Sequence, residues 1–214
     1  MTDDVKRKQA ASDGRGQART RFARRAVIDA AHTLFVERGY ATTSIEAIST
    51  LSDVPAATVY RLFSSKVGIL KALLDTSIAG DDQPTAVSDR PDVAPLFDEP
   101  DPHRLLAGFA GITTAINERT NDVYGVLVGA AGADPAAAEL LEVIQQQRDR
   151  GQRRIARALA RAGVLQPDLR ERDAADVIHT LMAPEVYRLL VVDRRWKPAR
   201  YQQWLTQVLT QQLL

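Results

Sequence analysis

The chain has 214 residues, of which 45% are hydrophobic and 26% charged, so it can bury a substantial core in one large domain or two small ones. It contains no cysteine, which excludes disulfides and thiolate metal sites. The N-terminus lacks an apolar signal-peptide core, and no run approaches the roughly 18 apolar residues of a membrane span. We therefore expect a cytoplasmic protein without membrane contact.

Charge is distributed unevenly along the chain, although the net charge is only +1. Residues 1–79 carry 12 Lys and Arg against 8 Asp and Glu, whereas residues 80–102 carry 1 against 7. A basic excess near one end of the chain is what electrostatic attraction to nucleic-acid phosphates requires.

The first 19 residues are predicted to form a flexible basic arm. They are polar and include Gly14 and Gly16. Such an arm could reach into a DNA minor groove, although a solvated tail explains Lys6–Lys8 at least as well. Arg19, Arg21, Arg24 and Arg25 are better candidates for phosphate contact, because they adjoin the first ordered helix.

That helix is expected over residues 20–38. Its apolar residues follow the spacing of one face of an amphipathic helix: Val27, Ile28, Ala31, Leu34 and Phe35. Gly39 suits the position after its C-terminal end, because glycine accepts the left-handed conformation. The apolar face would form one wall of a small core with the helices that follow.

Residues 42–63 are predicted to form two short helices joined by a tight turn. Thr43 is a plausible N-cap of the first helix, with Glu46 at capping-box spacing. The turn is expected at residues 52–54, and Pro55 can start the second helix, which covers about residues 56–63. Two such helices pinned by a third form a helix-turn-helix unit, whose second helix enters a DNA major groove. An ordinary helical hairpin is the alternative interpretation.

The run from Arg25 to Leu70 resembles the DNA-binding domain of the TetR family of transcriptional repressors. The resemblance depends on the following residues: Ala30, Ala31, Leu34, Phe35, Gly39, Tyr40, Thr42, Thr43, Ile45, Ile48, Thr58, Val59, Tyr60, Phe63, Lys66 and Leu70. The chain departs from the family pattern at Asp53, where a turn glycine is usual, and at Pro55, where a polar cap is usual. It also has Val67-Gly68 where an acidic residue is often found.

The resemblance implies a role in DNA binding for each matching position. Thr42 and Thr43 would hold a phosphate at a helix N-terminus, and Tyr60 and Lys66 would contact neighbouring phosphates. Four residues of the second helix or its start would face base edges: Pro55, Ala56, Thr58 and Arg61. Among these, Arg61 is the side chain able to make a bidentate contact to guanine.

The remainder of the chain is predicted to be helical apart from one loop, which makes the fold class all-α. A fourth helix over about residues 66–79 would complete a DNA-binding domain of residues 20–79. Residues 80–102 hold five prolines and seven acids and are expected to form a loop, with Leu96 and Phe97 docking on the body or covering a cavity. Residues 103–214 would form a C-terminal domain. Its helices are expected at about residues 105–116, 123–128, 135–163 and 175–191, with a bend at Pro184, and from residue 201 to the end.

The C-terminal domain is the predicted site of a small, largely apolar effector. Its glycines, among them Gly108, Gly111, Gly125 and Gly129, indicate either close helix crossings or space for a ligand. The predicted ligand-binding residues are Phe109, Ile112, Tyr124, Leu127, Val128, Ile144 and Met182.

The last two helices are unusually apolar for outer helices, and the resemblance implies that they pack against their copies in a homodimer. The predicted interface residues are Val177, Leu181, Pro184, Tyr187, Arg188, Tyr201, Trp204, Leu205 and Val208. Two-fold symmetry would place two DNA-reading helices on one face of a palindromic operator.

No catalytic, metal or cofactor site is predicted. His32, His103 and His179 lie far apart without metal-ligand spacing, and neither a nucleophile elbow nor a phosphate-binding loop is present. We therefore expect a repressor that binds operator DNA as a homodimer and is released by a small molecule. The alternatives are a constitutive DNA-binding protein without a ligand and an all-helical enzyme assembled from distant residues.

Overall fold

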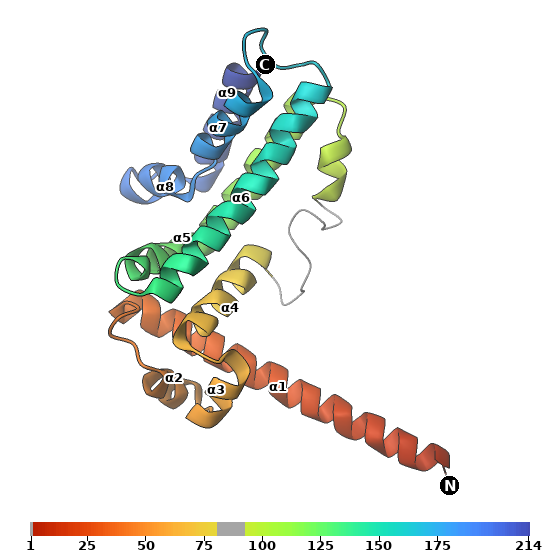
Figure 1. Ribbon diagram of the computed structural model, residues 1–214, viewed down its shortest axis with the longest axis vertical. Coiled ribbons are helices and arrows are strands. Elements are labelled where there is room, and N and C mark those ends of the chain that lie inside the picture. The colour runs from red at the N-terminus through yellow and green to blue at the C-terminus, as the bar shows by residue number, and fades with distance from the viewer. Residues whose placement is uncertain (1, 81–92) are drawn as a thin grey trace.

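The computed structural model describes residues 2–80 and 93–214, and every regular element within these residues is a helix (Figure 1). The fold class predicted from the sequence is therefore confirmed. The elements are α1 (Thr2–Arg38), α2 (Ile45–Ser52), α3 (Ala56–Phe63), α4 (Lys66–Ala79), η2 (Ala94–Asp98), α5 (Pro102–Ala131), α6 (Pro135–Arg161), α7 (Glu171–Leu181), α8 (Pro184–Tyr187), η3 (Arg188–Asp193) and α9 (Pro198–Leu213).

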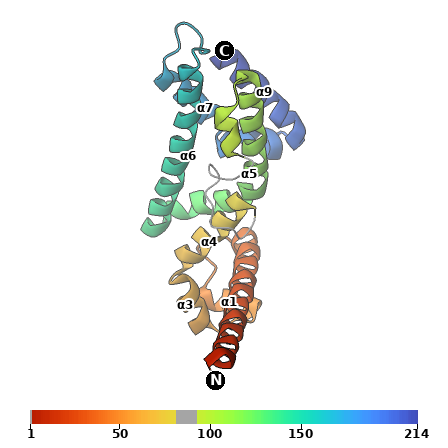
Figure 2. The same ribbon diagram turned by 90° about the vertical axis from the view of Figure 1, so that its right-hand side faces the viewer.

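The molecule has a head at one end and a body at the other. Figures 1 and 2 show α1, α2 and α3 in the head, with α4 leading into the body. In the body, α5 and α6 lie side by side, α7 packs on α6 and α9 packs on α5. None of the helices in the described part of the chain is long and apolar enough to cross a membrane.

The head forms around the apolar faces that the sequence predicts. The buried side chains include Val27, Leu34 and Phe35 from α1, Ile48 from α2 and Val59 from α3. Each of these helices buries residues three or four positions apart, which lie on one side of a helix. The predicted amphipathic face of the first helix is thus confirmed.

The first helix is longer than expected. Residues 2–19 were predicted to form a flexible arm, but α1 continues through them to Thr2. The segment has no proline and is rich in Ala, Lys, Arg and Gln, which favour helices. Because the packed part of α1 supplies the nucleus, each further residue extends the helix without a new nucleation cost.

The helix-turn-helix differs from its prediction only at the caps. α2 begins after Ser44, whose side chain accepts a hydrogen bond from the N–H of Ala47, so the N-cap predicted at Thr43 is wrong by one residue. Asp53 ends α2 with φ +54°, the left-handed conformation that favours glycine. The predicted second and fourth helices are confirmed: α3 spans Ala56–Phe63 and α4 spans Lys66–Ala79.

The body begins with a short helical turn docked on α5. In η2, the Phe97 ring lies 4.9 Å from the Phe109 ring, and Leu96 lies so close to Gly108 that a Cβ there would approach it to 2.6 Å. The expected docking of Leu96 and Phe97 is confirmed. Residues 81–92 of the predicted acidic loop lie outside the described residues.

The body helices were divided incorrectly in the prediction. The two helices expected at about residues 105–116 and 123–128 are one continuous helix, α5. Conversely, the single helix expected over residues 175–191 is broken rather than bent. Ala183 is extended, as a residue before proline prefers, and Pro184 starts α8. The chain then continues as η3, which has π-helical geometry.

Buried apolar residues form two clusters, and one of them spans the head and the body. It joins the head core and the inner face of α4 to Tyr124, Leu127 and Ile144 at the near ends of α5 and α6. The second cluster fills the far part of the body, around Tyr187, Tyr201 and Leu205. Because the head shares a core with α5 and α6, a shift of these helices would also move the head.

Candidate nucleic-acid interface

α3 presents one exposed face at the end of the molecule. Its inner side chains Val59 and Phe63 are buried, whereas Tyr60 is 48% exposed and Arg61 is exposed. Ala57 and Ser64 are also exposed. Residues 57, 60 and 61 follow i, i+3 and i+4 spacing, so they share one face of the helix, and Ser64 follows directly after its end.

The structure brings together most of the residues predicted to face base edges. Pro55 is exposed at the start of α3, and Ala56 and Thr58 are half-buried beside it. Ala57 was missed in the sequence prediction. Its helical spacing to Tyr60 and Arg61 is the signal that could have identified it.

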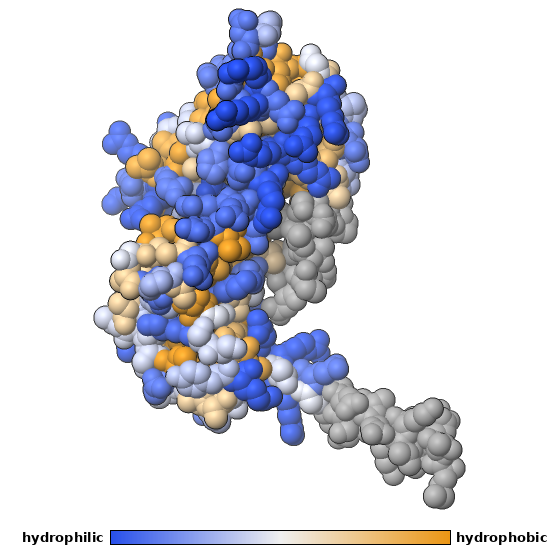
Figure 3. Space-filling view, in the orientation of Figure 1, coloured by the Kyte–Doolittle hydropathy of each residue, from blue (hydrophilic) through white to orange (hydrophobic). Residues whose placement is uncertain are grey.

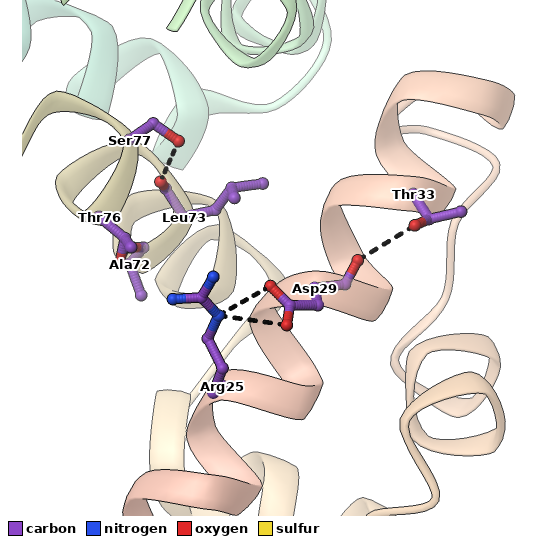
Figure 4. Close-up of polar contacts among 7 residues, drawn as sticks. All are labelled: Arg25, Asp29, Thr33, Ala72, Leu73, Thr76 and Ser77. Atoms are coloured by element: carbon purple, nitrogen blue, oxygen red, sulfur yellow. Dashed lines mark hydrogen bonds and ion pairs between the residues drawn. The ribbon is translucent and has the colours of Figure 1, made fainter. Parts of the chain in front are cut away.

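Contacts with α1 fix the position of α3. The guanidinium of Arg24 lies 4.7 Å from the centre of the Phe63 ring and donates a 3.4 Å hydrogen bond to the carbonyl of Leu62. Arg25 instead pairs with Asp29 on its own helix, at 3.0 Å and 3.2 Å from the two carboxylate oxygens, and lies between α1 and α4 (Figure 4). Both guanidiniums are therefore engaged within the head, which disfavours the phosphate contacts predicted for Arg24 and Arg25.

Arg19 and Arg21 are exposed on α1. The N-terminal part of α1 extends away from the rest of the head (Figure 1), and the surface where the helix leaves the head is mostly hydrophilic (Figure 3). The two arginines remain candidates for phosphate contact, presented by a helix rather than by a flexible arm.

The phosphate-binding role predicted for Thr43 is wrong, because its side chain points into the head. Thr43 is 2% exposed, and its hydroxyl donates to the carbonyls of Gly39 at 2.8 Å and Leu34 at 3.2 Å. The hydroxyl of Thr42 is exposed but donates to the carbonyls of Arg38 and Gly39. Both threonines thus stabilise the turn after α1, and the hydroxyl proton of each is donated to a backbone carbonyl of the head.

Lys66 also points inward rather than toward DNA. Its ammonium donates to the carbonyls of Tyr40 at 2.9 Å and Thr43 at 3.0 Å, and lies 4.1 Å from the centre of the Tyr40 ring. This geometry ties the start of α4 to the turn between α1 and α2. The predicted phosphate contact is corrected accordingly, since at most one N–H of the ammonium is left.

Two further contacts join the head to the body. The hydroxyl of Tyr40 donates a 2.8 Å hydrogen bond to Asp134, the N-cap of α6. This hydrogen bond is the main reason why the pKa of Asp134 is below its ordinary value. Burial and the hydrogen bond to Asp134 raise the pKa of Tyr40. At the other end of α4, Arg119 of α5 donates 3.1 Å hydrogen bonds to the carbonyls of Ser77 and Ile78.

A cavity of about 820 Å³ lies where the head meets the body. It is lined by the end of α1, the start of α4, α5, the start of α6 and η3. Gly125 and Gly129 of α5 line it, and a Cβ at either position would meet no atom within 4 Å. These two glycines therefore leave open space, whereas Gly108 permits a close approach.

None of the predicted ligand-binding residues lines this cavity. Five are core residues: Tyr124, Leu127 and Ile144 belong to the first cluster, and Phe109 and Met182 belong to the second. Ile112 is half-buried and Val128 is 46% exposed. The structure therefore does not gather these side chains around this cavity, and the buried ones are divided between two apolar clusters.

The predicted dimer interface is also wrong in part. Pro184, Tyr187, Tyr201 and Leu205 are buried within the chain, so they cannot contact a second copy. The other predicted residues are half-buried or exposed: Val177, Leu181, Arg188, Trp204 and Val208. The large exposed apolar residues of this region are instead Leu189 and Val192 on η3, which are 57% and 46% exposed.

The three histidines lie on different helices. His32 and His103 are exposed on α1 and α5, and His179 on α7 is half-buried with its Nδ1 2.7 Å from the side-chain oxygen of Gln152. Among the side chains that the structure describes, those of residues 16–80 and 93–214, no group of three His, Asp or Glu is arranged to hold a metal ion.

Comparisons with known proteins agree with the geometry of the head. Residues 27–73 match the family model of bacterial regulatory proteins, tetR family. The chain is 27% identical over 179 residues to the uncharacterized HTH-type transcriptional regulator YdeS of Bacillus subtilis, and the match covers 83% of each chain.

Two solved structures share the fold of the whole chain. NalD, the secondary repressor of the MexAB-OprM multidrug efflux pump in Pseudomonas aeruginosa, superposes with a TM-score of 0.70 at 21% identity, covering 90% of this chain and 96% of NalD. A protein described as a transcriptional regulator from Saccharomonospora viridis, in complex with choline, superposes with a TM-score of 0.66 at 18% identity, covering 89% and 97%.

Proposed function

Because this chain is a transcriptional regulator of the TetR family, we propose that it represses transcription by binding a palindromic operator as a homodimer and that a small molecule releases it. The observation that carries the proposal is the exposed face of α3. A short helix held by its buried side and exposed on the other has the form that enters a DNA major groove.

The exposed face offers two kinds of DNA contact. Arg61 has a guanidinium that can donate two parallel hydrogen bonds to guanine, and Ala57 can pack against a thymine methyl. The Tyr60 hydroxyl and the arginines of α1 suit phosphates, which fix the orientation of the protein. Since the exposed face of α3 has few polar side chains that could contact base edges, we expect DNA shape to contribute to sequence preference.

A homodimer would place two copies of α3 on one side of the duplex. Half-sites about 34–36 Å apart fit a two-fold symmetric pair of such helices. Leu189 and Val192 on η3 are large apolar residues exposed on the body, and burying them in an interface would be favourable. We therefore centre the proposed interface on η3 rather than on the buried aromatic residues of α8 and α9.

Release would follow from the connections between head and body. α4 is joined to α5 by Arg119 and to the head by Lys66, and the two parts share a core. A ligand that prefers one arrangement of the body helices therefore also favours one position of each head. If that position does not match the operator, the ligand shifts the population away from the DNA-binding form.

The decisive experiment is selection of bound duplexes from a random library by the purified protein. We expect an inverted repeat whose half-sites are one helical turn apart. Arg61→Ala should cost about 1–3 kcal/mol and relax preference at one position of each half-site, whereas Tyr60→Phe should weaken binding on all sequences.

Arg104→Ala provides a matched control, because Arg104 is exposed on the body and its loss removes the same charge. It should leave operator affinity unchanged. Equal loss of affinity on every sequence for Arg61→Ala, or selection of no sequence at all, would contradict the proposed role of α3.

A further inference from the structure

Three buried polar atoms in the body have no hydrogen-bond partner. They are the side-chain nitrogen of Asn117 on α5, Nη2 of Arg148 on α6 and the hydroxyl of Tyr201 on α9. Asn117 is 4% exposed and Tyr201 is 0% exposed. Leaving a buried polar group unpaired costs about 1–3 kcal/mol, so three such groups together require an explanation.

The three side chains belong to one place in the fold. Burial raises the pKa of Tyr201 to about 12, and both Asn117 and Arg148 act on this hydroxyl in the opposite direction. The hydroxyl therefore stays protonated near neutral pH and can donate. Each of the three groups can donate, and within the described residues none of the three buried atoms has a partner at hydrogen-bond geometry.

The charge of Arg148 makes the missing acceptor anionic. Within the described residues, no carboxylate lies within ion-pair distance of Arg148. The acids around it are engaged elsewhere: Asp149 pairs with Arg153 at 2.7 Å, and Glu185 accepts a 3.0 Å hydrogen bond from Tyr124. Arg148 is half-buried with its Nη2 inside the body, and a guanidinium that has no acid beside it can bind a carboxylate.

We propose that Asn117, Arg148 and Tyr201 bind the acidic group of the effector, and that the effector is a small amphipathic carboxylic acid. This inference rests on the proposed function and names the chemical class of its ligand. It also replaces the largely apolar effector expected from the sequence.

The surroundings of these donors suit the apolar part of such a molecule. The ring of Tyr187 meets the ring of Tyr201 edge to face, with centroids 5.0 Å apart, in the second apolar cluster.

The site is also next to the element that meets the head. η3 directly follows Tyr187, and its residues Arg188 and Val192 line the cavity at the junction. A ligand that draws Tyr201 toward Arg148 acts on Tyr187 and hence on η3. π-helical segments are frequent at functional sites, which agrees with this position.

The test is thermal denaturation of the full chain with two acids, octanoate and benzoate, and their uncharged analogues, 1-octanol and benzyl alcohol. We expect an acid at millimolar concentration to raise the Tm while its alcohol does not. Arg148→Met should weaken acid binding by about 10- to 100-fold, the usual value of a hydrogen bond to a charged group. Arg153→Met, on the same helix but exposed, should bind as the wild type does.

A second measurement separates a ligand site from a structural contact. Without ligand, Tyr201→Phe should leave the Tm unchanged or raise it, because an unpaired hydroxyl is removed. A Tm lowered by several degrees would mean that the hydroxyl is already satisfied and would overturn the proposal. Absence of a Tm shift with both acids would overturn it too.

Operator binding is measured in the same titrations. An acid that lowers operator affinity for the wild type but not for Arg148→Met supports both the site and the release mechanism. An acid that binds through Arg148 while operator affinity stays constant supports the site and contradicts release.

Discussion

Tyr40 donates its hydroxyl to Asp134 at 2.8 Å, which joins the turn after α1 to the first turn of α6 across 94 residues of sequence. Asp134 also accepts hydrogen bonds at the N-terminus of α6 through its N-cap position. The same carboxylate therefore stabilises a body helix and fixes the head against it, so head and body are not independent units.

The Tyr40–Asp134 contact should be visible as a pH-dependent stability. The hydrogen bond lowers the pKa of Asp134 below its ordinary value of 3.8, so its stabilisation is fully present above that pH. It is lost as the pH falls through the lower pKa of the folded state. Tyr40→Phe should therefore be less stable than the wild type in urea denaturation at pH 7, and the difference should shrink in acid.

A suitable control for this pH profile is Thr33→Val, which removes a side-chain hydrogen bond within α1 that involves no carboxylate. Its effect should not change between neutral and acidic pH. A Tyr40→Phe difference that is the same at every pH would contradict the assignment.

Lys66 is expected to act on stability more than on DNA affinity. Lys66→Met removes two hydrogen bonds to backbone carbonyls and a contact with the Tyr40 ring, and should lower the free energy of unfolding by about 1–3 kcal/mol. Lys71→Met is the matched control, because Lys71 is exposed and pairs only with Asp75 on the same helix. The salt dependence of operator binding tests the alternative, in which Lys66 contacts a phosphate. If the slope of log K against log salt concentration falls by about one for Lys66→Met but not for Lys71→Met, Lys66 does contact a phosphate.

Asp53 is expected to carry backbone strain. With φ +54° it adopts the conformation that costs a residue with a Cβ about 1–2 kcal/mol. Asp53→Gly should relieve this strain and raise the free energy of unfolding by roughly 0.5–1 kcal/mol, after the larger entropy of glycine in the unfolded chain is subtracted. Asp53→Ala keeps a Cβ at the same φ and should not stabilise. Urea denaturation of both variants distinguishes strain relief from the loss of a charge.

The exposed apolar residues of η3 provide a test of the dimer. Leu189→Asp would place a charge at the centre of the proposed interface, and sedimentation should then show a monomer at concentrations where the wild type is a dimer. Leu51→Asp changes an equally exposed leucine in the head and should leave the dimer intact. Unchanged sedimentation of the Leu189 variant would exclude η3 as the interface.

Local signals in the sequence were sufficient to predict the two helices of the helix-turn-helix and α4. α3 starts where Pro55 sets a favourable φ, and α4 lies between the Ser65 cap and Gly80, which takes the left-handed conformation at its end. Such signals act over one turn of helix, so they can be read without the fold. The periodic apolar residues identified the buried face of each helix for the same reason.

The partners that each helix face contacts could be identified only from the tertiary structure. The spacing of Tyr201 and Leu205 identifies a buried stripe on the last helix, but these two side chains pack inside the same chain rather than against a second copy. Thr43 and Lys66 have side chains suited to phosphate, but their donors face carbonyls that the fold brings near them. The unpaired donors of Asn117, Arg148 and Tyr201 come from three helices distant in sequence. Periodicity is a property of one helix, whereas these contacts depend on how helices are placed against one another.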